Sequence, residues 1–292
     1  MKDLKVGWGA GLAAYLLWGA FPLYFVLLAR SAPLEVVAHR VIWSLAFCLL
    51  ILAVTRGFDG FAAIWRDRRA ALLMTAAGVL ITLNWSTYII GVLSGRTLEA
   101  ALGYFINPLA VVAFGVLVFK EKLRPLQKLA LVFGVAAVIV MVLAYGEIPW
   151  IALILTFTFG TYSLVKKVVG ATVKPVPGLA FETTVVVPLA LAFVIYLGAV
   201  GESTFTFDGY GALLVASGVI TAIPLLMFAV AAKHLPMVAL GVVQYLAPIG
   251  QFLIGWLILD EPMPASRWAG FALVWVAIAL FVGDALRQGR RR

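Results

Sequence analysis

Ten continuous apolar runs, most of them about 20 residues long, occupy nearly the whole chain and leave it few ways to fold. A hydrocarbon core about 30 Å thick is spanned by about 20 helical residues, so each run can cross a membrane. The runs do not alternate apolar and polar residues, which argues against a membrane β-barrel. The backbone in lipid must satisfy its own hydrogen bonds, so each run is expected to be a helix. The ten predicted spans are residues 6–28, 35–54, 71–93, 99–119, 127–145, 150–166, 178–199, 209–231, 237–259 and 267–284.

The composition agrees with a lipid environment. Hydrophobic residues make up 64% of the 292 residues and charged residues 12%, whereas a soluble domain is about 45–50% apolar. The first run is too long for a cleavable signal peptide and is expected to be the first membrane anchor. Cys48 is the only cysteine, which excludes an intrachain disulfide and a multi-cysteine metal site. We expect neither a metal nor a cofactor.

The basic residues indicate the orientation of the chain. The net charge is +9, and a basic excess can indicate nucleic-acid binding. Here, however, only four of the 22 lysines and arginines fall on one side of the ten predicted spans: Arg30, Arg40, Arg96 and Arg267. This bias follows the positive-inside rule and predicts that both termini are cytoplasmic. The expected partner of the basic surface is therefore the lipid bilayer and not nucleic acid.

The chain repeats itself at an offset of 140 residues. Pro108 matches Pro248 and Glu121 matches Glu261 at this offset. The match predicts two units of five spans, residues 1–147 and 148–292. Five is odd, so the second unit enters the membrane from the opposite side and is inverted. Inverted repeats are the architecture of transporters that expose one site alternately to two compartments. The alternative is a duplication that builds a helical bundle without transport.

Several short motifs carry a family resemblance. They are His39-Arg40 followed by Trp43-Ser44, Asn84-Trp85 with Tyr88, Glu99-Ala100 leading into Gly103–Leu109 (GYFINPL), and Gln244-Tyr245 with Ala247-Pro248. With these motifs the chain resembles the EamA repeat of the drug/metabolite transporter superfamily, and within it the RarD-type members. The resemblance implies an exporter of small metabolites or drugs in the bacterial inner membrane. It also implies an association with chloramphenicol sensitivity, and it does not fix a physiological substrate.

Polar and aromatic residues inside the predicted spans are candidates for a substrate cavity. Amide side chains in lipid need partners, either another helix or a substrate. Paired prolines in corresponding helices are a pointer to the transport path, because proline frees a backbone carbonyl and favours a kink. We expect Pro108 and Pro248 to kink their helices. The predicted cavity residues are Asn84, Trp85, Tyr88, Tyr104, Asn107, Gln244 and Gln251.

Four charged or titratable residues are candidates for gating or for carrying a coupling proton: His39, Arg40, Glu99 and Glu182. His39 and Arg40 lie near one end of the second span, and Glu182 lies at the corresponding place in the seventh. Plainer roles are open for each of them. Arg40 can extend to the membrane surface, Glu99 can lie at a helix N-terminus where the helix dipole favours it, and His39 can be a hydrogen-bonding partner.

Other functional classes have little support in the sequence. The chain contains no G-x-S-x-G, H-E-x-x-H or P-loop motif, so we expect no enzymatic activity. A channel would carry a filter sequence or a charged ring, and a sensor or structural protein is the remaining alternative. The sequence predicts alternating access to a small-molecule substrate. It leaves open the substrate, proton coupling against facilitated diffusion, and a monomer against a homodimer.

Overall fold

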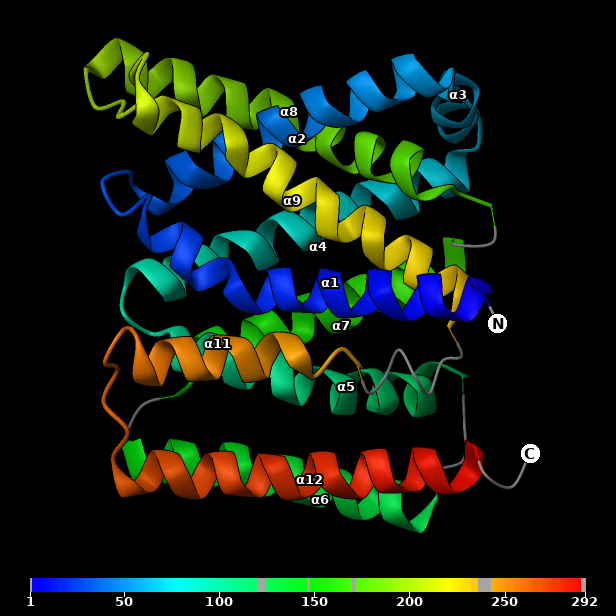
Figure 1. Cartoon of the computed structure of the whole chain (residues 1–292), viewed down its shortest axis with the longest axis vertical. Coiled ribbons are helices and arrows are strands. Elements are labelled where there is room, and N and C mark those ends of the chain that lie inside the picture. Colours follow the sequence, from blue (N-terminus) through cyan, green and yellow to red (C-terminus); the bar gives the residue numbers. More distant parts are fainter. Residues whose placement is uncertain (1, 120–123, 146–147, 170–171, 236–242, 290–292) are drawn as a thin grey trace.

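The computed structural model describes residues 2–119, 124–145, 148–169, 172–235 and 243–289. These residues form a bundle of helices that run along a common direction (Figure 1). The helices are α1 (Lys2–Val26), α2 (Pro33–Thr55), α3 (Phe58–Arg66), α4 (Arg68–Leu93), α5 (Thr97–Phe119), α6 (Pro125–Tyr145), α7 (Trp150–Val169), α8 (Pro175–Val200), α9 (Gly209–His234), α11 (Leu246–Leu257) and α12 (Ala265–Gly289).

The predicted fold class is confirmed. The described residues are helical with no strand, and ten of their helices correspond to the ten predicted spans. Six helices are long and apolar enough to cross a membrane over their described residues alone. The start of α1 and the end of α12 lie at the same end of the bundle, here called the terminal end (Figure 1). The opposite end, here called the loop end, carries the connections at residues 27–32, 94–96, 201–208 and 258–264.

Two elements differ from the sequence prediction. Helix α3 was not predicted, because its nine residues form a short amphipathic segment and not an apolar run. The predicted span 237–259 is also shorter as a described helix: α11 begins at Leu246, after a turn at Gln244 and Tyr245. Pro248 is therefore in the first turn of α11, where a missing N–H interrupts no helical hydrogen bond. Pro108, by contrast, lies inside α5.

Contacts between helices follow a two-fold pattern. If each helix of the first unit is paired with its counterpart in the second, α1 corresponds to α7, α2 to α8, α4 to α9, α5 to α11 and α6 to α12. Under this pairing three contacts of one unit with the other each have a matching contact: α1–α9 matches α7–α4, α2–α9 matches α8–α4, and α1–α11 matches α7–α5. The self-matching pairs α2–α8, α5–α11 and α6–α12 also pack together. The boundary at residues 147 and 148 stays a prediction.

Matching aspartates cap two matching helices. Asp67 precedes α4, and its Oδ1 accepts hydrogen bonds from the backbone N–H groups of Arg69 and Ala70. Asp208 precedes α9 and accepts from Tyr210 and Gly211 in the same way. The side chain of Thr206 also donates to Asp208, and these hydrogen bonds hold the pKa of Asp208 below its usual range. An aspartate cap satisfies donors that the first helical turn leaves free.

Replacing Asp208 by alanine is expected to lower the melting temperature of the protein at neutral pH. The carboxylate has a lowered pKa in the folded protein, so its contribution is present above the unfolded pKa and is lost as the pH falls through the folded value. The difference between wild type and Asp208→Ala should therefore disappear under acidic conditions. Thermal unfolding at a series of pH values measures it. A difference that grows on acidification would contradict the assignment of the cap.

Two glycines in matching positions allow the closest helix crossings. A Cβ built on Gly78 of α4 would lie 2.7 Å from the carbonyl oxygen of Glu182 in α8. A Cβ on Gly218 of α9 would overlap the backbone of Trp43 and Ser44 in α2. Since neither backbone can move aside easily, both crossings require a residue without a side chain.

Gly218→Ala is expected to separate α2 from α9 and to lower the melting temperature by several degrees. Gly198→Ala is the matched control, because a Cβ at Gly198 in α8 would meet nothing within 4 Å and alanine favours the helix. Thermal unfolding of both variants in detergent measures the difference. Equal melting temperatures for the two variants would show that the crossing at Gly218 is loose.

Candidate substrate site

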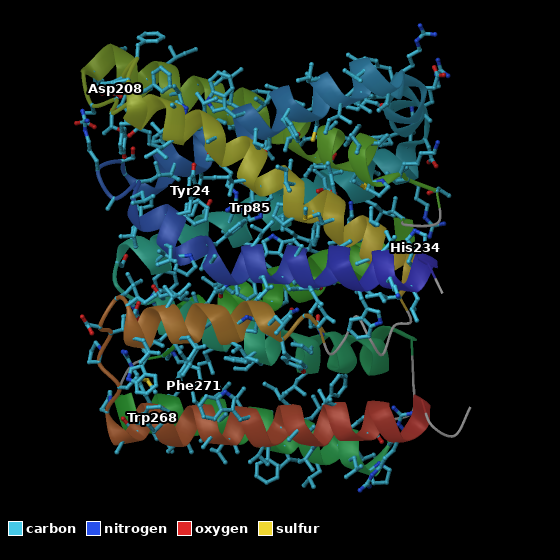
Figure 2. All side chains as sticks on the ribbon, in the orientation of Figure 1. Tyr24, Trp85, Asp208, His234, Trp268 and Phe271 are labelled. Carbon is cyan, nitrogen blue, oxygen red and sulfur yellow. The ribbon has the colours of Figure 1, made fainter. Side chains whose placement is uncertain are left out.

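Arg40 is buried in the middle of the bundle. Its side chain points from α2 into a cage of rings, with Cζ 4.3 Å from the ring centroid of Trp85, 5.3 Å from that of Phe25 and 5.6 Å from that of Phe21. Figure 2 shows Trp85 about midway between Asp208 at the loop end and His234 at the terminal end. Arg40 is only 3% exposed, so its guanidinium does not extend to the membrane surface.

The guanidinium of Arg40 is only partly satisfied by protein groups. Nε donates to the Thr221 hydroxyl in α9 at 2.6 Å, while Nη1 has no hydrogen-bond partner. The faces of the aromatic rings attract the cation, but they do not accept the remaining N–H bonds in the way a carboxylate does. The site therefore contains a buried cation with an unpartnered hydrogen-bond donor, Arg40 Nη1.

Asn84 joins three helices. From α4, its amide nitrogen donates to the carbonyl of Leu155 at 3.2 Å and to the hydroxyl of Thr158 at 3.0 Å, both in α7. Its amide oxygen accepts from the hydroxyl of Tyr104 in α5 at 2.9 Å. The amide thus has protein partners on both its oxygen and its nitrogen, and these contacts give Asn84 a structural role whether or not it also touches substrate.

Tyr88 lies beside this bridge with a free hydroxyl. Its ring packs against Phe25 at 6.0 Å and against Tyr104 at 5.7 Å between centroids. The hydroxyl is buried and has no hydrogen-bond partner. Four of the predicted cavity residues, Asn84, Trp85, Tyr88 and Tyr104, therefore lie together, and Arg40 belongs to the same group.

The other predicted cavity residues extend along α5 and α11. Asn107 is buried one turn beyond Tyr104 along α5, and its Oδ1 has no partner. Gln251 donates from Nε2 to the carbonyl of Trp18 in α1 at 3.1 Å, and its Oε1 has no partner. Gln244 is half-buried in the turn before α11. Asn107 and Gln251 thus offer buried acceptors, while Arg40 and Tyr88 offer donors.

At the loop end, residues 201–208 fold onto α2 and onto Ser31 in the connection that precedes it. The carboxylate of Glu35 accepts from the backbone N–H of Thr204 at 2.7 Å, from the Thr204 hydroxyl at 2.9 Å and from the Ser203 hydroxyl at 3.3 Å. The ring of His39 stacks on Phe205 at 5.2 Å, and its Nδ1 accepts from Trp43. The sequence interpretation missed Glu35, although an acidic residue at the first position of the predicted span 35–54 was a signal.

A related arrangement lies nearer the terminal end. Glu182 is 1% exposed. It accepts from Lys166 at 2.8 Å and from the hydroxyl of Tyr162 at 3.2 Å. At an offset of 142, the first residues of α2 and α8 match as Pro33 and Pro175, and Arg40 then matches Glu182. Opposite charges therefore occupy matching positions, and of the two only Glu182 is paired with an oppositely charged group of the described chain.

The same offset matches His39 with Phe181. Phe205, from the segment that connects α8 and α9, stacks on His39. Trp65, from the α3 segment that connects α2 and α4, packs on Phe181 with centroids 4.6 Å apart. Each connecting segment thus covers the matching helix of the other unit, which gives α3 a place in the two-fold pattern.

Two further glutamates hold helix ends. Glu99 forms an ion pair with Arg96 at 2.6 Å and accepts from the backbone N–H of Ile151 at 2.8 Å, at the start of α7. Glu261 accepts from the backbone N–H groups of Thr97 and Leu98 at the start of α5. Glu261 therefore caps α5 and not the next helix along the chain, while its counterpart Glu121 lies outside the described residues.

Comparison with known proteins fits this architecture. The sequence profile of the EamA-like transporter family matches residues 6–143 and 148–283. The chain belongs to the EamA-like transporter family. As a member of this family it is a multi-pass membrane transporter, and the similarity covers both predicted units. A solved crystal structure aligns with a TM-score of 0.62 at 20% identity over 94% of this chain and 96% of the other, which supports the fold alone.

The sequence relatives place the chain among RarD-type members of the EamA-like family. It is 44% identical to Protein RarD of Streptomyces exfoliatus over 99% of this chain and 92% of that protein. It is 35% identical to Protein RarD of Escherichia coli over 99% and 98%, respectively. It is 31% identical to the Chloramphenicol-sensitive protein RarD of Pseudomonas aeruginosa over 96% and 95%. The resemblance drawn from the motifs is confirmed.

Proposed function

We propose that this protein is a secondary transporter that exports a small metabolite or drug-like molecule across the bacterial inner membrane, with both termini in the cytoplasm. The observation that carries the proposal is a set of buried polar atoms without partners: Arg40 Nη1 and Tyr88 Oη beside the aromatic rings, and Asn107 Oδ1 and Gln251 Oε1 in α5 and α11. Buried polar groups are normally satisfied, and exceptions require a reason. A substrate that supplies the missing partners is such a reason.

The two-fold contact pattern supports alternating access as the mechanism. Since α1–α9 and α7–α4 are matching contacts, the two units can exchange conformations about the central group. At the loop end, the hydrogen bonds between Glu35 and Thr204 would have to break when the site opens there. We assign His39 to this gate because it stacks on the same loop. For coupling to protons, we propose Glu182, since its side chain is buried and accepts from Lys166 and Tyr162.

Counterflow in proteoliposomes tests the function. Purified protein would be screened for thermal stabilisation by amino acids, small metabolites, organic acids and amphenicols. Each ligand found would then be followed as exchange into vesicles, with and without a pH gradient. Saturable counterflow supports a carrier, and loss of the gradient response in Glu182→Gln supports proton coupling. Unsaturable flux supports a channel, and binding without exchange supports a sensor.

A further inference from the structure

We infer that Arg40 and Tyr88 form the binding site for the negative group of the transported molecule, and that this molecule is a small organic monoanion with a single carboxylate attached to a flat apolar body. The inference deepens the proposed transport function and rests on it. It starts from Arg40, whose guanidinium lies among three aromatic rings and which is only 3% exposed.

The first step is that Arg40 lacks a counter-ion within the described chain. None of the ion pairs of the described residues includes Arg40. The described carboxylates that are buried all bind elsewhere: Glu35 binds the 201–208 loop, Glu182 binds Lys166, Glu261 binds the start of α5, and Asp284 binds Arg124. A buried charge is costly unless it is paired, so the missing anion is expected to come from outside the protein.

The second step is the number of charges and donors. Arg40 supplies one positive charge and an unpartnered Nη1, and Tyr88 supplies an unpartnered hydroxyl. Both residues pack against the ring of Phe25, with Arg40 Cζ 5.3 Å and the Tyr88 ring centroid 6.0 Å from its centroid. One charge and two free donors match a carboxylate, which has one charge and two acceptor oxygens. A phosphate dianion would leave one negative charge unbalanced.

The third step is the surroundings of the cation. Trp85, Phe21 and Phe25 present ring surfaces around the guanidinium. Flat apolar ligands gain contact area from such walls, while a few polar groups fix their orientation. A zwitterion would also need a counter-charge for its ammonium group: Asn107 and Gln251 offer only neutral acceptors, and each buried carboxylate of the described chain is already occupied. An aromatic or unsaturated monocarboxylate fits the charges and the rings together.

The test compares charged and neutral forms of one molecule. The probes are 3-phenylpropionate and its uncharged amide, 3-phenylpropionamide, with sodium chloride and phenylalanine as further arms. Binding is measured by isothermal titration and thermal shift on the purified full-length protein, at constant ionic strength. We expect the carboxylate to bind at least tenfold more tightly than the amide. Tighter binding of the amide or of phenylalanine, or the same shift from chloride alone, would overturn the inference.

Variants assign the preference to these two residues. Arg40→Gln should abolish the difference in affinity between the acid and the amide, and Arg40→Lys should retain part of it. Tyr88→Phe should weaken binding of the acid several-fold without changing binding of the amide. Arg66→Gln removes an exposed charge from α3 and is the matched control, for which the wild-type preference is expected. A preference for the acid that survives Arg40→Gln would assign the anion to another site.

A stability measurement separates binding from a structural role. If Arg40 serves to bind an anion, the Arg40→Met variant without ligand should have the same melting temperature as wild type or a higher one, because a buried unpaired charge has been removed. A fall of many degrees would make Arg40 a structural clamp and overturn the inference. In vesicles, exchange of the amide but not of the acid would support the transport function and contradict the anion-binding site. Exchange of neither form, together with no exchange in the wider screen, would contradict the transport function itself.

Discussion

Lys166→Met is expected to destabilise the protein more than any other substitution of a partly exposed residue. Glu182 is 1% exposed, and its Oε1 lies 2.8 Å from Lys166 Nζ. Removing the cation leaves a buried carboxylate without its charged partner. Breaking a fully buried ion pair costs about 3–5 kcal/mol. The side chain of Lys166 is 32% exposed, so water compensates in part and the free energy of unfolding should fall by less than this.

A second substitution should recover part of the lost stability. In the double variant Lys166→Met with Glu182→Gln, the buried charge is gone and the amide oxygen can still accept from the Tyr162 hydroxyl. We expect the double variant to be more stable than Lys166→Met alone, as measured by unfolding in denaturing detergent. Lys174→Met, at an exposed residue before α8, is the control for loss of a lysine. Losses that simply add would show that the two residues act independently.

The sequence was sufficient for the helices because each span is defined locally. A run of about 20 apolar residues can only be helical in lipid, and the offset between Pro108 and Pro248 located the matching helices. Helix α3 was not among the predicted spans, because its nine residues carry polar and charged side chains among the apolar ones. The start of α11 also differed, since apolar character alone does not distinguish a helix from the turn at Gln244 and Tyr245.

The residues of the candidate site could be predicted from the sequence, but their hydrogen bonds and contacts could not. Asn84, Tyr88 and Tyr104 were singled out as polar groups in lipid, and the structure brings them together. That Asn84 binds α7 and that Arg40 has no counter-ion depend on which helices become neighbours. Glu35 accepts from Thr204 across a separation of 169 residues, and Phe205 of the same loop stacks on His39, contacts that no local pattern reveals. Whether these residues bind substrate stays a prediction.

Asn84→Ala is expected to lower the free energy of unfolding by roughly 2–4 kcal/mol, because three hydrogen bonds are lost and each bond between membrane helices contributes about 0.6–1.7 kcal/mol. The hydroxyls of Tyr104 and Thr158 lose a partner at the same time. Ser86→Ala is the matched control: it lies on the same helix, and its hydroxyl bonds only to the Thr82 carbonyl one turn away. Its loss should be within about 0.5 kcal/mol.

The double variant Asn84→Ala with Tyr104→Phe decides how the amide acts. If Asn84 is a bridge between α4 and α5, the two single losses overlap, and the double variant loses less than their sum. If Asn84 instead serves mainly to contact substrate, Asn84→Ala keeps its melting temperature and loses counterflow alone. The structure favours the first result, because the amide already has partners in α5 and α7 on both its oxygen and its nitrogen. In that case we expect the substrate to meet this part of the site through the Tyr88 hydroxyl and Arg40 Nη1, which have no protein partner.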